Sequence, residues 1–220
     1  MTSEPNLSSA KSEGKASVVY VIDDEEPMRL ALSALLRSIG LRVETFASSR
    51  EFLAFPKHSG PSCLILDVRL RGESGLAFQQ ELARSSLRMP ILFITAHGDI
   101  EMTVKAMKAG AVDFIPKPFR NQDLIDAVDQ ALKRDSERLD AEQATAALRA
   151  AYKSLTPREK EVMAFVVTGL MNKQIASEMR LSEITVKIHR GQAMKKMAAR
   201  SVADLVRMAE ALSIEPHRTK

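Results

Sequence analysis

Four short apolar stretches of the chain each lead into a side chain that can do chemistry. Residues 62–66 precede Asp67, residues 18–22 precede Asp23 and Asp24, residues 91–94 precede Thr95, and residues 112–116 precede Lys117. Such runs are typical of strands buried on both faces of a parallel sheet, and ligands bind at the carboxyl edge of such a sheet. An isolated aspartate after a strand more often caps a turn. We expect this group to be functional because all five side chains would meet at one edge.

The side chains at this edge suit the transfer of a phosphoryl group. Two adjacent carboxylates beside a third form an oxygen-rich site for Mg²⁺, which proteins hold with one or two carboxylates, waters and phosphate oxygens. An aspartate can also attack phosphorus and become an aspartyl phosphate. A lysine and a metal ion would neutralise the developing charge, and a hydroxyl would hydrogen-bond a phosphoryl oxygen. This chemistry leaves open a phosphorylated regulator and an aspartate-nucleophile phosphatase or phosphotransferase.

These motifs resemble the four signatures of a two-component receiver domain. They read Val-Ile-Asp-Asp-Glu at residues 21–25, Leu-Asp at 66–67, Ile-Thr-Ala at 94–96 and Lys-Pro-Phe at 117–119. The resemblance implies that Asp67 accepts the phosphoryl group and that Mg²⁺ is held by Asp23, Asp24, Asp67 and the main-chain carbonyl of Arg69. It also implies that Thr95 and Lys117 sense the phosphate and that Phe114 is the switch aromatic. The Lys117–Pro118 bond is expected to be cis. In one departure, Leu70-Arg71 stands where the family often has Met-Pro, while Gly75 falls at the family's position.

Amphipathic segments between these strands complete an α/β pattern. Pro27 and Gly40 bracket a helix over residues 28–39, residues 41–46 alternate as a strand, and helices are predicted over residues 48–55, 76–84 and 99–109. Five alternations of strand and helix with right-handed crossovers predict a doubly wound, flavodoxin-like α/β receiver domain of strand order 2-1-3-4-5. We place this domain at residues 18–134, after a disordered tail of residues 1–17.

The second half of the chain differs in composition. Residues 121–151 contain no Gly or Pro and are rich in helix formers, so the last receiver helix should continue into a helical linker at residues 135–152. Fraying near residues 135–140 is the alternative. Residues 153–220 hold 13 Lys and Arg against 7 Asp and Glu, whereas residues 18–134 hold 15 of each. A basic half beside a neutral one predicts a polyanionic partner.

This basic half is predicted to form four short helices. Thr156, Pro157 and Glu159 make a capping box at the first helix, Gly169 ends it, and helices follow at residues 172–179, 184–197 and 202–212. Two short helices joined by a tight turn, the second rich in cations, match a helix-turn-helix. The motifs Leu-Thr-Pro-Arg-Glu at 155–159 and Thr-Val-Lys-Ile-His at 185–189 closely resemble the LuxR-type DNA-binding domain, an all-α four-helix domain that we place at residues 153–217.

A receiver followed by a LuxR-type domain resembles the NarL/FixJ response regulators, and residues 97–99 and 106–114 look closest to the FixJ branch. The resemblance implies a transcription factor that a sensor histidine kinase phosphorylates on Asp67. The protein would then form a homodimer and bind double-stranded promoter DNA, with RNA polymerase as a further partner. Lys187 and Ile188 would face base edges, and Lys173, Thr185, Arg190 and Lys195 would lie near phosphates. Some members use a third reading side chain where this chain has Gly191.

Other classes of protein fit the sequence less well. Aspartate-nucleophile enzymes usually carry a second acid two residues after the nucleophile, where this chain has Arg69, so we expect a slow switch and not a dedicated enzyme. A regulator that works without phosphorylation is disfavoured because all five acceptor-site residues are present. The single Cys63 lies in an apolar run and suggests a reducing compartment. No apolar run is long enough to span a bilayer, so we expect a cytoplasmic protein.

Overall fold

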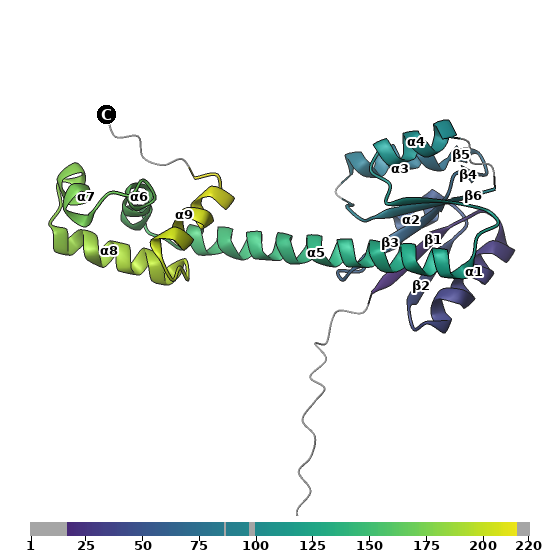
Figure 1. The fold of residues 1–220 in the computed structure, drawn as a ribbon, viewed down its shortest axis with the longest axis horizontal. Helices are drawn as coiled ribbons and strands as arrows, with labels where there is room; N and C mark the ends of the chain where they lie inside the picture. Colours follow the sequence, from purple (N-terminus) through teal and green to yellow (C-terminus); the bar gives the residue numbers. More distant parts are fainter. Residues whose placement is uncertain (1–16, 86, 97–99, 215–220) are drawn as a thin grey trace, which may run out of the picture. The chain divides into compact units, whose positions relative to one another are not determined.

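The computed structural model describes residues 17–85, 87–96 and 100–214, in two compact units that divide between Leu139 and Asp140. The first unit contains a five-stranded parallel sheet of order β2-β1-β3-β6-β7 (Figure 1). The strands are β1 (Val18–Ile22), β2 (Arg42–Phe46), β3 (Ser62–Asp67), β6 (Ile91–Thr95) and β7 (Asp113–Pro116). This order confirms the predicted doubly wound fold. Residues 1–16 of the predicted tail and Asp99 of a predicted helix lie outside the described residues.

Helices cover both faces of this sheet (Figure 1). The helices α1 (Glu26–Ser38) and α5 (Asn121–Lys153) pack on one face, and α2 (Ser49–Ala54), α3 (Gly75–Arg84) and α4 (Ile100–Lys108) pack on the other. Alternate residues of a strand serve the two cores. In β1, Val19 and Val21 belong to the core under α1 and α5, whereas Tyr20 and Ile22 belong to the other core. All five β1 residues are buried, which explains why this strand shows no polar alternation in the sequence.

The predicted helix ends agree with the structure to within two residues, but one element was missed. A short antiparallel hairpin, β4 (Arg69–Leu70) and β5 (Glu73–Ser74), follows Asp67 directly. Its turn contains Gly72, whose φ of 78° is a left-handed conformation that glycine adopts without steric cost. Strands of two residues are too short to leave a periodic pattern, so sequence reasoning had no signal for this hairpin.

The second unit is a small helical domain. α5 is a single helix through residues 135–140, so the predicted linker is helical and the fraying alternative is not observed. The helices that follow are α6 (Pro157–Val166), α7 (Asn172–Met179), α8 (Glu183–Lys196) and α9 (Val202–Ala211). The predicted capping box is confirmed: Thr156 N–H donates to Glu159 Oε2 at 2.8 Å, and Glu159 N–H donates to Thr156 Oγ1 at 3.3 Å. One apolar core, centred on Val162, Ile175 and Val186, joins α6, α7 and α8.

Candidate phosphoacceptor site and nucleic-acid interface

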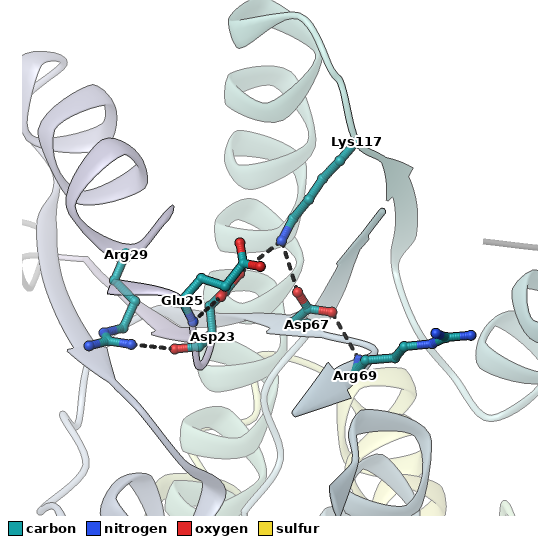
Figure 2. A network of polar contacts seen from close by, with 6 residues as sticks. All are labelled: Asp23, Glu25, Arg29, Asp67, Arg69 and Lys117. Carbon is teal, nitrogen blue, oxygen red and sulfur yellow. Dashed lines mark hydrogen bonds and ion pairs between the residues drawn. The ribbon is translucent and has the colours of Figure 1, made fainter. Parts of the chain in front are cut away.

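The carboxyl edge of the receiver sheet gathers an ammonium and two carboxylates. Asp67 is the last residue of β3, and Asp23 and Lys117 directly follow β1 and β7. Lys117 Nζ donates to Asp67 Oδ2 at 2.8 Å and to Asp23 Oδ2 at 3.0 Å (Figure 2). The three side chains are 12%, 10% and 2% exposed for Lys117, Asp67 and Asp23, so water screens their interaction weakly. The ammonium therefore acts as the shared counterion of two carboxylates that would otherwise repel each other.

Backbone groups orient both carboxylates. Asp23 Oδ1 accepts a hydrogen bond from the Glu25 N–H at 2.8 Å, and Asp67 Oδ1 accepts one from the Arg69 N–H at 2.9 Å (Figure 2). Arg29 Nη1 donates to the Asp23 carbonyl at 2.7 Å, which ties α1 to the end of β1. Each carboxylate thus has one oxygen held by the backbone and the other by Lys117, and the main chain of Arg69 lies against the Asp67 carboxylate.

The protonation states at this edge follow from burial and pairing. Burial raises the pKa of Asp23 above its usual value, although the hydrogen bonds from Glu25 and Lys117 oppose the shift. Burial alone would lower the pKa of Lys117, but its hydrogen bonds to Asp67 and Asp23 raise that pKa above its usual value. Lys117 therefore stays protonated through the neutral range and holds a full positive charge beside Asp67.

The third predicted acid, Asp24, is turned toward a different cation. Arg71 Nε lies 3.1 Å from Asp24 Oδ2, and the Arg71 side chain is 85% exposed. Within the described residues no three His, Cys, Asp or Glu side chains are already grouped to hold a metal ion. The donor chemistry nevertheless fits Mg²⁺, because this ion needs only one or two carboxylates beside waters and phosphate oxygens. An exposed ion pair such as Asp24–Arg71 is worth at most about 1 kcal/mol and can open for a divalent cation.

The two remaining receiver positions lie on neighbouring strands. Thr95 ends β6, is 1% exposed, and its carbonyl accepts a hydrogen bond from the Lys117 N–H at 2.7 Å. Phe114 lies in β7 opposite Phe93, is partly buried, and has its ring centroid 6.1 Å from that of Phe93. The Lys117–Pro118 bond is cis, as expected. Thr95 therefore belongs to the same sheet edge as Asp67, whereas Phe114 packs against the core under α4.

Sequence reasoning gave no structural role to Gly75, which the loop after Asp67 requires. The Gly75 N–H donates to the Val68 carbonyl at 2.9 Å, and a Cβ atom at Gly75 would lie 2.3 Å from the Asp67 carbonyl oxygen. The obstructing atom belongs to the backbone, so it cannot rotate away. The glycine therefore allows α3 to begin directly beside Asp67, and only the nonlocal geometry reveals this.

In the second unit the predicted DNA-contacting residues fall into two groups. Lys173, Lys187, Ile188 and Lys195 are exposed. Thr185 and Arg190 are half-buried and have partners within the domain: Thr185 Oγ1 lies 2.7 Å from Ser182 Oγ, and Arg190 Nη1 donates to Asn172 Oδ1 at 2.7 Å. The Arg190–Asn172 bond joins α7 to α8, so Arg190 also helps fix the helix-turn-helix.

A buried acid contacts the last turn of α8. Lys196 Nζ, in the last turn of α8, donates to Glu159 Oε2 at 2.7 Å, and Glu159 is 5% exposed. The hydrogen bond from Lys196, together with the one from the Thr156 N–H, holds the pKa of Glu159 below its usual value. Glu159 thus caps α6 and anchors α8 with one carboxylate.

Each of the two units matches a known protein family. Residues 19–129 match the response regulator receiver domain, and residues 153–209 match the bacterial regulatory proteins of the LuxR family. The chain is 54% identical to Nodulation protein W of Bradyrhizobium diazoefficiens over 93% of its length and 90% of the relative's. It is 41% identical to the transcriptional regulatory protein FixJ of Rhizobium meliloti, with 90% and 97% covered. The solved structure of response regulator StyR matches with a TM-score of 0.81 and 47% identity, over 89% of this chain and 98% of that one.

In residues 17–85, 87–96 and 100–214, no helix is both long and apolar enough to cross a bilayer. The parallel sheet with its acidic edge and the basic helix-turn-helix correspond one to one with the two matched families. The chain belongs to the NarL/FixJ family of two-component response regulators, in which a receiver domain is joined to a LuxR-type DNA-binding domain that regulates transcription.

Proposed function

We propose that Asp67 is the phosphoacceptor through which a sensor histidine kinase controls the affinity of this protein for promoter DNA. The observation that carries the proposal is the bridge from Lys117 Nζ to Asp67 Oδ2 and Asp23 Oδ2. A buried, charged lysine beside a backbone-oriented carboxylate supplies positive charge where a phosphoryl group would add negative charge. Asp67 is also the acidic side chain at the end of the central strand β3, where a donor can approach from the sheet edge.

The proposed reaction moves a phosphoryl group onto an Asp67 carboxylate oxygen. This oxygen forms a bond to phosphorus while the bond from phosphorus to the donor nitrogen or oxygen breaks, and the donor leaves with that electron pair. Lys117 then shares its charge with the phosphoryl oxygens, and the Thr95 hydroxyl can donate to one of them. Bound Mg²⁺, held by Asp23, Asp24, Asp67 and the Arg69 carbonyl, would supply further positive charge to those oxygens.

The acyl phosphate should be hydrolysed slowly, as suits a signal and not an enzyme. A phosphatase would use a second acid two residues after Asp67 to handle the leaving group, and Arg69 at that position is exposed and cationic. Arg69 cannot donate a proton readily, because a guanidinium keeps its proton up to high pH. Phosphorylated Asp67 should therefore persist long enough to shift a binding equilibrium.

The test is phosphorylation of the full chain by a small acyl phosphate with Mg²⁺, followed by intact mass spectrometry. The wild type and Asp129→Asn, which changes an exposed aspartate of α5, should each gain one phosphoryl group. Asp67→Asn should gain none, because an amide is a poor nucleophile. Full labelling of Asp67→Asn would remove the assignment.

We further propose that phosphorylated receivers pair through α4 and β7. Ile100, Val104 and Met107 are 84%, 44% and 43% exposed and share one face of α4 at helical spacing. Movement of Thr95 toward a phosphoryl group would open space for Phe114 and alter this surface. Pairing would present two DNA-binding domains to two half-sites, which can raise operator affinity roughly 10²-fold without new base contacts.

Sedimentation with a phosphoryl mimic, beryllium fluoride and Mg²⁺, tests the pairing. The wild type should become dimeric and Val104→Glu should stay monomeric. Leu53→Glu alters a residue of α2 with a similar exposure of 42% and should dimerise like the wild type. A monomeric activated wild type would instead favour a receiver that covers the DNA-binding domain and releases it on phosphorylation.

For the second unit we propose that Lys187 and Ile188 read base edges in the major groove, with Lys173, Thr185, Arg190 and Lys195 near phosphates. RNA polymerase is the expected partner at the promoter. The support is the exposure of Lys187 and Ile188 on a helix whose far face is buried in the domain core.

A further inference from the structure

Large apolar side chains exposed in the second unit are concentrated on the recognition helix. In residues 140–214 they are Met171, Ile184 and Ile188, which are 66%, 73% and 57% exposed. Ile184 and Ile188 are four residues apart in α8, so they are neighbours on one helical face. Single exposed apolar residues are ordinary on protein surfaces. An adjacent apolar pair on the face that should enter a DNA groove instead calls for an apolar group of the DNA to contact it.

The pair lies on the side of α8 that faces away from the domain core. Val186 is fully buried, and at about 100° per residue the positions two before and two after it lie nearly opposite it. Gly191 continues the same face three residues later, and a Cβ atom there would meet no atom within 4 Å. Ile184, Ile188 and Gly191 therefore place no side-chain hydrogen-bond donor or acceptor at the centre of this face, although the exposed amide of Gln192, four residues after Ile188, lies beside them. Lys187 lies beside this stretch and Lys195 continues it one turn beyond Gly191, which suits a polyanion.

We infer that Ile184 and Ile188 read the C5-methyl groups of thymines in the operator half-site, an inference that rests on the proposed DNA-binding role of α8. Thymine is the base that presents a methyl group in the major groove, and the other base edges there present polar atoms. An isoleucine against those polar edges would remove their water without replacing the hydrogen bonds, which costs free energy. The absent side chain at Gly191 lets the helix approach closely enough for aliphatic contact.

The spacing of the pair also limits the pattern of bases. Four residues of helix rise about 6 Å, which is close to two base-pair steps of about 3.4 Å each. The half-site should therefore contain two thymines within about two steps of each other, on one strand or across the two strands.

The experiment begins with selection of DNA from a random pool by the full chain, activated with beryllium fluoride and Mg²⁺. Each thymine of the selected half-site is then replaced by deoxyuridine, which removes only the methyl group. At the two contacted positions the affinity should fall about fourfold each, since burying one carbon contributes about 0.8 kcal/mol. Ile184→Ala should abolish the deoxyuridine effect at one position and Ile188→Ala at the other.

Matched controls separate this inference from the function on which it rests. Met171→Ala removes the third exposed apolar side chain and should keep both deoxyuridine effects. A chain that binds its operator specifically and salt-dependently, yet is indifferent to deoxyuridine at every position, would overturn methyl reading while leaving the DNA-binding function intact. A deoxyuridine effect that persists in both isoleucine variants, or that Met171→Ala also abolishes, would overturn the assignment. Absence of any DNA binding at low salt would instead refute the proposed function, and the inference with it.

Discussion

Replacement of Asp135 by alanine should destabilise the receiver domain, because this buried acid fastens α5 to the start of β3. Asp135 is 1% exposed, and its Oδ2 accepts a hydrogen bond from the Ser62 N–H at 2.8 Å. Its Oδ1 accepts from Arg138 Nε and Nη2 at 2.9 and 2.8 Å. Ser62 begins the strand that ends in Asp67, so the contact ties the linker helix to the strand that carries the proposed acceptor.

The expected loss follows from the groups that alanine would leave behind. Ser62 is 5% exposed, and a buried N–H without an acceptor costs about 1–3 kcal/mol. The Arg138 side chain is 31% exposed and can regain water, so loss of the ion pair adds little. We expect about 1–3 kcal/mol in total, which for a domain of this size lowers the melting temperature by roughly 4–12 °C.

Scanning calorimetry of the full chain measures this loss, because the two compact units should unfold in separate transitions. Asp135→Ala should lower the receiver transition and leave the other unchanged. Asp135→Asn keeps an oxygen that can accept from the Ser62 N–H and should recover at least half of the loss. The matched control is Asp129→Ala, an exposed aspartate of the same helix. If Asp135→Ala cost no more than Asp129→Ala, the buried bond to Ser62 would not stabilise the domain.

Three further predictions concern the acceptor loop, the recognition helix and acid stability. Gly75→Ala should lower the unfolding free energy by about 1–3 kcal/mol, because its Cβ would meet a backbone oxygen at 2.3 Å; an unchanged urea midpoint would refute the clash. Lys187→Ala should weaken DNA binding by about 1–3 kcal/mol at the selected operator and relax sequence choice. Lys195→Ala should weaken binding to all sequences alike and flatten its salt dependence. If Lys187→Ala lost only non-specific binding, Lys187 would not be a base reader. Because the folded-state pKa of Glu159 lies below its usual 4.5, its stabilisation of the second unit is present above that pH and is lost as the pH falls below it. Circular-dichroism melts of the wild type should show this acid loss, and Glu159→Gln should lose less stability over the same range; parallel pH profiles would contradict it.

Local patterns in the sequence predicted most of the helices and strands and named the candidate site residues. The apolar run before Asp67 predicted β3 because a strand buried on both faces has no polar positions. The Thr156–Glu159 capping box predicted the start of α6, since both hydrogen bonds of this motif lie within four consecutive residues. The capping interactions connect neighbours along the chain, so residue type and spacing carry that information. The pairing of β3 with β1 and β6 joins distant segments, and the sequence shows only the apolar composition that such burial requires.

Contacts between distant residues were decided by the tertiary structure. Lys117 reaches Asp23 across 94 positions of sequence, and Asp135 reaches Ser62 across 73. The parallel order of the strands predicted that Lys117 and Asp23 lie at the same sheet edge. The geometry of their hydrogen bond and the Asp24–Arg71 ion pair follow from packing. Asp135 lies where composition suggested the start of a linker, and no local pattern distinguishes a buried aspartate in a polar helix from an exposed one. Such a residue gains its role only when the sheet and the helix close around it, because burial is a property of the assembled fold.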